Sequence, residues 1–398
     1  MALAGPAAAA GQGLPRAPVT WFDGRLVVSG SVSTSVAGGG KDSSFNAGDY
    51  DQDTMRLVEV AVAASAAPHP VAFMVADVRA AGSYDGSGWY LRPATLLVGV
   101  RPLPRRAFAV IAGVMQTPFA GSGRRYYGRD NVLVGLPLIY QYPSSLRPEA
   151  LTGSADTLLA ARGTGGTGYY RYGRYRARSG LPLVDARGWN AGVGVTAEGA
   201  RLRATAAVAR GSLSNPLSRG DGGGWQVSGR VEGRPLLGLV LGTSAARGPY
   251  ADDPSPDAPA WTAGAPMETA FGVDAEYSRG YWVVRGEVVQ SRREIATLRG
   301  PSLPSPLRVT GIDLEGRYRL APGLYAAARL GRLWFGPIRG EAVGAQPWDA
   351  DVTRVEGGIG WSPTRPVLLK VVYQYNWRPD VMGPRSLHRA ATQAVIWF

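Results

Sequence analysis

Residues 387–398 read LHRAATQAVIWF and decide the fold. Successive side chains of a strand point to opposite faces, so this stretch places Ile396 and Phe398 on one face and Gln393 and Trp397 on the other. A free chain end usually frays into water unless it is tied down. The simplest restraint is a closed sheet whose last strand pairs with its first. The stretch therefore predicts a closed, all-β architecture.

The same two-residue alternation recurs along the chain. In residues 312–320, for example, Leu314 and Tyr318 alternate with Glu315 and Arg317. We count about sixteen such strands of roughly ten residues each, the length that crosses a bilayer when strands tilt. A soluble sandwich buries an apolar inner face, and no repeat of fixed period indicates a propeller. We therefore expect the apolar faces to meet lipid and the charged faces, Glu315 included, to meet a wet lumen.

The connections between the predicted strands alternate between short and long. The short ones are residues 66–70, 102–105, 198–200, 233–235, 278–280, 321–323 and 362–365. The long ones are residues 38–53, 80–90, 117–188, 211–224, 247–266, 292–307, 335–351 and 378–386. Tight turns on one side and long loops on the other, over an even number of strands, are typical of outer-membrane barrels.

On strand number, loop alternation and the final Phe398, the chain resembles the sixteen-stranded bacterial porins, the broad group of general and phosphate-selective porins. The resemblance implies a transmembrane, antiparallel, up-and-down β-barrel in the bacterial outer membrane, formed by residues 24–398. Phe398 would then belong to the signal that barrel-assembly machinery reads. Residues 1–23 would be a signal-peptide remnant or a flexible lead-in.

The resemblance also implies an aqueous pore for small anionic or neutral solutes, in contact with outer-membrane lipid and lipopolysaccharide. It leaves open whether the protein is a homotrimer or a monomer. We expect no enzyme activity, no cofactor, no metal and no nucleic-acid partner. Cysteine is absent, and the two histidines, His69 and His388, are isolated without metal-ligand spacing.

The chain is basic, with a net charge of +13. Its only lysines are Lys41 and Lys370, so arginine carries almost all of the positive charge. The preference for arginine over lysine is typical of a GC-rich genome, whereas the excess of base over acid indicates an anion-attracting surface.

The long segment 117–188 is the main functional candidate, because it follows the fifth predicted strand, where porins carry a loop that folds inward. Its ten arginines and four acidic residues give it a net charge of +6. Arginines in a narrow pore favour anions, and tyrosines can stack on them. The candidate residues of this segment are Arg124, Arg125, Tyr126, Tyr127, Arg129, Arg171, Arg174 and Arg176. The candidate residues of the barrel wall are Arg317, Arg319 and Arg354.

Several alternatives remain open from the sequence. The long segment could be a solvated basic loop that contacts lipopolysaccharide, or residues 132–142 and 168–178 could form two more strands, making eighteen. The segment could also plug the barrel, leaving a non-conducting structural or adhesive protein. A lipase-type enzyme that uses His388 is a further alternative.

Overall fold

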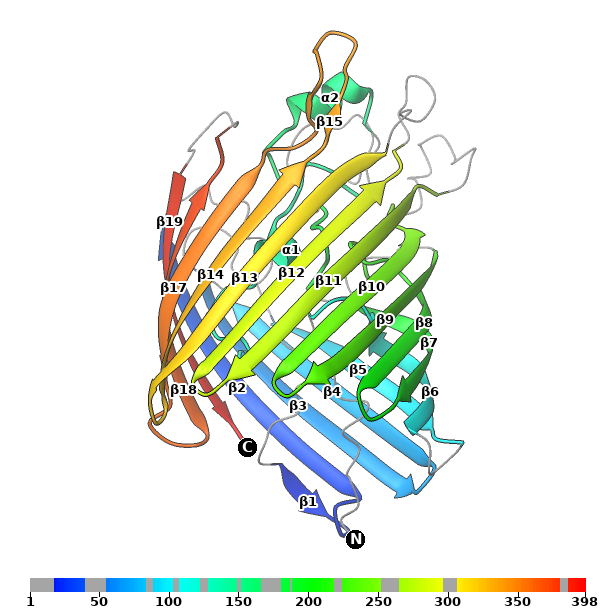
Figure 1. Ribbon diagram of the computed structural model, residues 1–398, viewed down its shortest axis with the longest axis vertical. Helices are drawn as coiled ribbons and strands as arrows, with labels where there is room; N and C mark the ends of the chain where they lie inside the picture. Colours follow the sequence, from blue (N-terminus) through cyan, green and yellow to red (C-terminus); the bar gives the residue numbers. More distant parts are fainter. Residues whose placement is uncertain are drawn as a thin grey trace.

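The computed structural model describes residues 18–39, 55–83, 89–102, 107–121, 128–148, 152–165, 180–186, 188–217, 224–251, 265–295, 306–379 and 386–398. Sixteen long, tilted strands form one closed barrel (Figure 1). The predicted all-β barrel and its strand number are therefore confirmed.

The first eight barrel strands are β2 (Leu26–Gly39), β3 (Met55–His69), β4 (Ala72–Ser83), β5 (Trp89–Val100), β6 (Ala107–Gln116), β7 (Trp189–Glu198), β8 (Leu202–Arg210) and β9 (Trp225–Leu236). The other eight are β10 (Leu239–Pro249), β11 (Met267–Arg279), β12 (Trp282–Arg293), β13 (Leu307–Ala321), β14 (Leu324–Phe335), β17 (Val352–Trp361), β18 (Val367–Trp377) and β19 (Ser386–Trp397).

The remaining elements are short. Strand β1 (Val19–Trp21) pairs with the start of β2, and β15 (Pro337–Ile338) pairs with β16 (Gln346–Pro347) between β14 and β17. Helices α1 (Leu138–Gln141) and α2 (Ala155–Ala160) lie between β6 and β7. Within the described ranges, neither helix is long and apolar enough to span a membrane.

The barrel closes where the last strand meets the first. Strand β19 runs antiparallel to β2, with Thr392 opposite Val36 and Trp397 opposite Ser31. Every other pair of neighbouring barrel strands is also antiparallel, and the barrel strands follow one another in the order of the chain. Residues 132–142, which could have formed a seventeenth strand, instead contain α1. Residues 168–178 lie outside the described residues.

One end of the barrel carries connections of at most six residues, and the other carries the long ones together with the five-residue connection between β4 and β5. Strand β1 and the end of β19 lie at the tight end (Figure 1). Three of the tight turns between barrel strands contain a glycine with positive φ: Gly238 at 82°, Gly280 at 56° and Gly323 at 76°. Such backbone suits the two-residue hairpins of a twisted sheet. A Cβ on Gly323 would also lie 2.6 Å from the Ser362 carbonyl oxygen, so this turn requires glycine.

The outer surface has the pattern of a membrane-spanning barrel. Its middle is made of exposed aliphatic side chains such as Leu314, which is 51% exposed. Exposed tryptophans lie at both edges of this apolar band, among them Trp334 and Trp377 towards the long connections and Trp282 and Trp361 towards the tight turns. Tryptophan rings gather at the two membrane interfaces, so the band between them matches the hydrocarbon layer.

Candidate functional site

Residues 117–188 connect β6 to β7, and we call this connection the inward segment. Its described residues lie against the inner wall of the barrel and fill part of the inside. Leu138, Ile139 and Leu183 of this segment are buried against the inward-facing Val289 and Leu333 of β12 and β14. The inner wall is therefore apolar where it holds the segment, not uniformly wet as the alternation of charged residues predicted.

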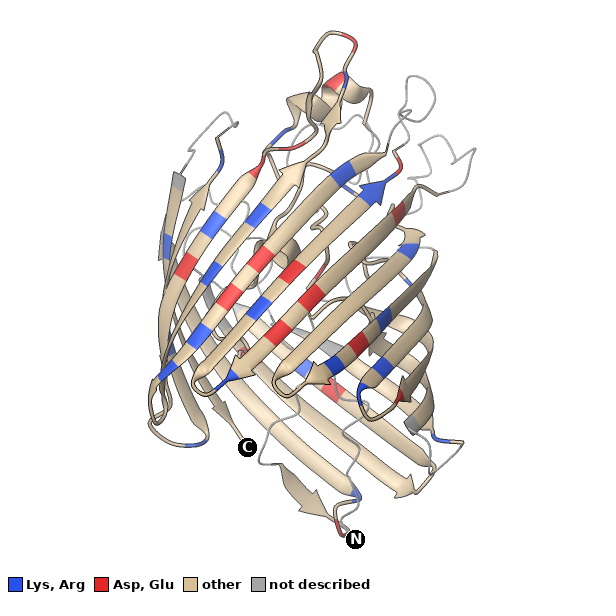
Figure 2. Cartoon of the chain, viewed as in Figure 1, with Lys and Arg blue, Asp and Glu red and all other residues tan. Residues whose placement is uncertain are grey.

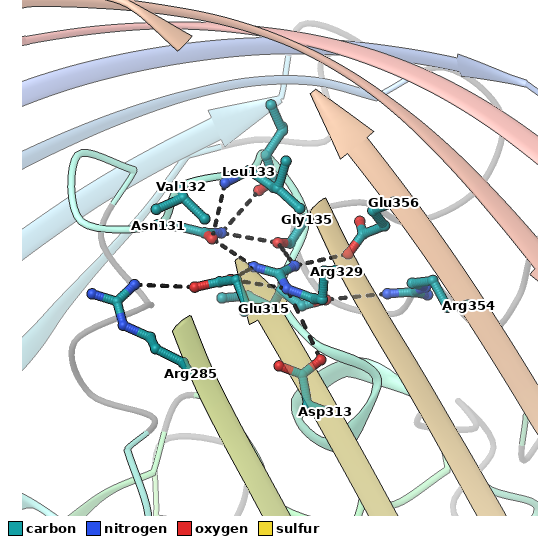
Figure 3. Close-up of polar contacts among 12 residues, drawn as sticks. Asn131, Val132, Leu133, Gly135, Arg285, Asp313, Glu315, Arg329, Arg354 and Glu356 are labelled. Atoms are coloured by element: carbon teal, nitrogen blue, oxygen red, sulfur yellow. Dashed lines mark hydrogen bonds and ion pairs between the residues drawn. The ribbon is translucent and has the colours of Figure 1, made fainter. Parts of the chain in front are cut away.

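A second part of the inward segment is held by Arg329 of β14 (Figure 3). Its guanidinium bridges two wall carboxylates, with Nη2 2.6 Å from Glu315 and Nη1 2.8 Å from Glu356. The same group donates to Asn131 Oδ1 at 2.9 Å and to the Gly135 carbonyl oxygen at 2.7 Å. Arg329 is fully buried, and the carboxylates offset the cost of burying its charge.

Glu315, Arg329 and Glu356 belong to a longer line of charges, because strand register places them directly opposite one another. The line continues with Arg285 Nη1 3.0 Å from Glu315 and Arg285 Nε 2.7 Å from Glu276. Opposite charges that face each other across strands stabilise a sheet. We call these residues and their neighbours in register the charge row: Glu276, Arg285, Glu315, Arg329, Glu356, Gln374 and Arg389. Figure 2 shows red and blue bands alternating across this side of the barrel.

Lys370 of β18 is the third attachment point. Its buried Nζ donates to the carbonyl oxygens of Asn131 at 2.8 Å and Leu133 at 3.0 Å, and also to that of Gly128. An ammonium has three donors and no acceptor, so three carbonyls of one turn use its full capacity. This lysine therefore fixes the backbone of residues 128–133 to the wall.

Further polar contacts tie other parts of the inward segment to the wall. Arg354 Nη1 donates to the Leu136 carbonyl oxygen and to Gln141 Oε1, each at 3.1 Å. Tyr140 donates its hydroxyl to Glu287. Leu136 also packs against the cluster of Ala94 and Trp189 on β5 and β7. The described residues of the segment therefore contact β12 and β17 as well as the cluster on β5 and β7.

At the end with the long connections, Asp349 joins two turns of the inward segment. Its carboxylate accepts from the backbone nitrogens of Ser145 and Gly163, each at 2.7 Å, and from Ser145 Oγ at 2.9 Å. Burial raises the pKa of Asp349, and these hydrogen bonds act in the opposite direction without cancelling the effect. The ionised form is thus the costly one to bury here.

Not all inner charges are covered by the inward segment. Arg230 of β9 forms an ion pair with Asp274 of β11, and their side chains are 15% and 13% exposed. Glu276 and Arg285 are more accessible, at 29% and 22%. These strands therefore present ionised groups to the inside of the barrel.

The predicted site residues fall in different places. Arg317 and Arg319 of β13 face inward near the tight turns, with their guanidinium carbons 5.6 Å from the Tyr325 ring and 4.7 Å from the Tyr281 ring. Arg354 is buried under the inward segment, not facing a solute path. The Arg129 guanidinium lies 5.0 Å from the Trp397 ring. The other predicted residues lie outside the described residues: Arg124, Arg125, Tyr126, Tyr127, Arg171, Arg174 and Arg176.

Sequence reasoning missed the residues that hold the inward segment, chiefly Arg329, Lys370 and Asp349. Lys370 had one available signal, since it is one of only two lysines in the chain and lies in a strand. Nothing comparable distinguishes Arg329 from the other arginines of alternating strands.

Comparison with known proteins supports the fold. No protein-family model and no curated protein matches this chain. Among solved structures, it is similar to the anion-selective porin from Comamonas acidovorans, at 11% identity and a TM-score of 0.58 over 94% of this chain and 99% of that one. It is also similar to Salmonella typhi OmpF in complex with daunomycin, at 9% identity and a TM-score of 0.56 over 96% of this chain and 100% of that one. A third similar structure is OmpT, an outer-membrane protein of Vibrio cholerae, at 11% identity and a TM-score of 0.56 over 96% of this chain and 100% of that one.

At these identities the likeness concerns the fold. The chain has the sixteen-stranded, porin-like fold of the bacterial outer-membrane β-barrels. Its apolar outer band and its predicted outer-membrane location agree with that fold.

Proposed function

We propose that this protein is an outer-membrane porin, an aqueous channel through which small hydrophilic solutes diffuse passively. The observation that carries the proposal is the contrast between the two faces of one wall. Strands β9, β11 and β12 expose the ionised Arg230, Glu276 and Arg285 on the inside, while their outer faces expose Val231, Phe271 and Val288. A water-filled barrel in a lipid bilayer requires this contrast between a charged inner face and an apolar outer face.

The inward segment would form the constriction of this channel. It is tied to β14, β17 and β18 and reaches β5, so a solute must pass beside it. Attachment by buried, hydrogen-bonded charges gives the constriction a fixed position on the wall. Removal of one buried partner of such a group is strongly unfavourable.

We propose further that the channel prefers anions. The charge row contains three acidic residues and three arginines, so it contributes no net charge. The inward segment, at +6, is the source of positive potential. A field focused in a narrow, low-dielectric passage raises the local concentration of counter-ions. The preferred solutes would then be small and anionic or neutral.

A planar-bilayer recording tests the channel proposal. Purified, folded protein should insert in discrete conductance steps, and the reversal potential in a KCl gradient should report anion preference. A sealed barrel, which gives no current although its folding is verified, would refute the channel and favour the plugged structural protein. That alternative has its own support, because the apolar packing of Leu138 and Leu183 fills part of the inside.

We propose transport and not hydrolysis. His388 lies on the outer face of β19, where its Nδ1 contacts the Tyr373 hydroxyl and its ring lies 5.0 Å from that of Tyr375. An imidazole among aromatic rings on the lipid side is poorly placed to activate a nucleophile for a water-soluble substrate.

A homotrimer is the assembly we propose. One of the similar structures is described as a trimer form of Vibrio cholerae OmpT, at 12% identity and a TM-score of 0.53. Mass measurement of the detergent-solubilised, folded protein would test it, and a monomer mass would contradict it.

A further inference from the structure

The pairing between β5 and β6 is the shortest in the barrel wall. Strand β5 pairs with β4 from one end to the other, Trp89 to Val100, but it pairs with β6 only from Leu96 to Val100. In the described part of the chain, no strand pairs with residues 89–95 on the β6 side. We call this incompletely paired contact the β5–β6 joint.

The local sequence explains why pairing stops at the joint. Pro93 of β5 has no backbone N–H, and prolines in sheets are found at edges and bulges. Ala94, the next residue, is left out of the register with β4 and forms a bulge. On β6, Gly113 has a φ of 131°, and a Cβ there would lie 2.2 Å from the Leu96 carbonyl oxygen. The strand pairing is therefore interrupted here by the sequence itself.

Both faces of the wall are apolar at the joint. Leu96 and Val98 of β5 face outward and are 56% and 51% exposed, and Leu97 between them faces inward. Leu97 belongs to a buried group on the inner wall, which we call the inner apolar cluster: Phe73, Val75, Leu97, Met115 and Ala207. The inside of a water-filled barrel is polar, so an aqueous channel does not account for this cluster.

The inner apolar cluster lies across the barrel from the charge row. Strands β5 and β13 are the fourth and the twelfth of the sixteen barrel strands, so they are half a turn apart. The accessible Glu276 and Arg285 are on β11 and β12, beside β13. The two sides of the barrel's inside therefore suit different solutes, ions along one and uncharged apolar molecules along the other.

Apolar side chains cover the joint beyond its last strand pair. Ala94 and Trp189 are buried there and pack against Val114 of β6 and against Leu136 and Ala186 of the inward segment. Contacts between apolar side chains can part without the breaking of hydrogen bonds between strands. Separation of the wall therefore costs least at this place, and it would connect the lipid with apolar side chains on the inside.

We propose that the β5–β6 joint is a lateral entrance, through which small uncharged apolar molecules pass from the hydrocarbon layer to the inner apolar cluster. Along this route an apolar molecule exchanges lipid for apolar side chains and stays out of water. A charged or sugar-like solute would lose its hydration there without gaining a hydrogen-bond partner. The entrance serves molecules that dissolve poorly in a water-filled channel, so it is a second route, separate from the channel.

The test uses adamantyl diazirine, a small uncharged apolar photolabel, dissolved in the lipid of vesicles that contain the folded protein. Because the chain has no cysteine, engineered disulfides are unambiguous. Leu96→Cys with Val114→Cys staples the last strand pair of the joint, where opening would begin. The control, Val100→Cys with Val110→Cys, staples the other end of the same pairing. Mass spectrometry verifies each disulfide and measures the labelling of individual residues.

In the wild type, we expect the label on Phe73, Val75 and Met115 of the inner apolar cluster, with Leu314 on the outer face as the reference for lipid exposure. The first staple should lower the labelling of the inner cluster about fivefold or more, and reduction of its disulfide should restore it. The control staple should leave it as in the wild type. Trp189→Ala removes the largest side chain of the cover and should raise it.

Three results would overturn the proposal. The first is an unlabelled inner cluster in the wild type although Leu314 is labelled. The second is unchanged labelling of the inner cluster in the first staple, which would show that the label arrives through the water inside the barrel. The third is equal loss of labelling in both staples, which would indicate a general distortion of the wall. The KCl conductance of the same proteins tests only the channel, because a barrel that carries no ions can still take up the label through the joint.

Discussion

The Phe398 ring lies against the backbone of Gly30, so closely that a Cβ added to Gly30 would be 2.4 Å from Phe398 Cε1. The two residues also exchange backbone hydrogen bonds, from Phe398 N to Gly30 O at 3.0 Å and from Gly30 N to Phe398 O at 3.3 Å. This contact lies where β19 closes on β2, so the absence of a side chain at residue 30 makes room for the final aromatic ring.

Gly30→Ala should therefore weaken barrel closure by about 1–3 kcal/mol, the usual cost of overpacking. The matched control is Gly38→Ala, on the same face of the same strand, where an added Cβ has no neighbour within 4 Å. The folded fraction is measured by the heat-modifiable shift in gel mobility. Combining Gly30→Ala with Phe398→Ala should recover part of the loss, and equal behaviour of the two glycine variants would contradict this reading.

Adjacent residues of β13 should respond differently to substitution. Leu314→Arg places a charge on the lipid face and should cost about 2–4 kcal/mol near the midplane. From the sequence, Glu315 was expected to face water, which would make Glu315→Gln nearly silent. That expectation was wrong, because Glu315 is 2% exposed between Arg285 and Arg329.

Glu315→Gln should instead cost about 3 kcal/mol, since it leaves a buried arginine short of one partner. Glu276→Gln is the matched control, because it removes the same charge from the same row at a side chain that is 29% exposed. Exposed pairs contribute at most about 1 kcal/mol. Urea unfolding in detergent or lipid vesicles measures all three variants, and a Glu315→Gln value as small as the control would show that the charge row is hydrated.

The fold could be predicted because it depends on local pattern. A two-residue period identifies the strands, and the lengths of the connections identify the two ends of the barrel. The contacts inside the barrel could not be predicted in this way. Asn131 and Arg329 are 198 residues apart, and alternation tells only that Arg329 faces inward. Whether water or another segment lies opposite depends on how residues 117–188 fold, and that stretch has no regular period.

The attachment through Lys370 leads to a prediction about channel behaviour. Lys370→Met removes the donors of three buried carbonyl groups and should destabilise the attachment by about 2–3 kcal/mol. The freed turn should move, so single-channel traces should show more conductance levels and a higher mean conductance. Arg319→Met is the control for loss of an inward positive charge, because Arg319 is exposed near the tight turns. Steady traces from Lys370→Met would mean that the other contacts suffice.

Asp349 should make stability depend on pH. Because burial raises its pKa in the folded protein, the folded state binds this proton more readily than the unfolded state. Stability should therefore increase as the pH falls through the raised folded pKa, and this gain is complete below the ordinary carboxyl pKa. Asp349→Asn cannot titrate, so subtracting its pH profile isolates the effect. If the pH profile of wild-type stability runs parallel to that of Asp349→Asn from pH 7 to pH 3, Asp349 makes no pH-dependent contribution to stability.

The last prediction concerns selectivity. Replacing Arg124, Arg125 and Arg129 with Glu removes three positive charges and adds three negative ones, which takes the inward segment from +6 to zero. The reversal potential in a KCl gradient should move towards cation selectivity. The shift should be largest at low salt and fade at 1 M, where the Debye length is about 3 Å.

Replacing Arg171, Arg174 and Arg176 with Glu changes the net charge of the segment by the same amount, so this triple variant serves as the comparison. If only one exchange shifts the reversal potential, that group of arginines lines the passage and the other does not. If neither does, the selectivity comes from the wall, and Arg317→Glu with Arg319→Glu should then shift it. Arg354 is the least suitable wall residue for this purpose, because its charge is buried under the segment, where substitution would release Leu136 and Gln141 before it altered the field seen by a solute.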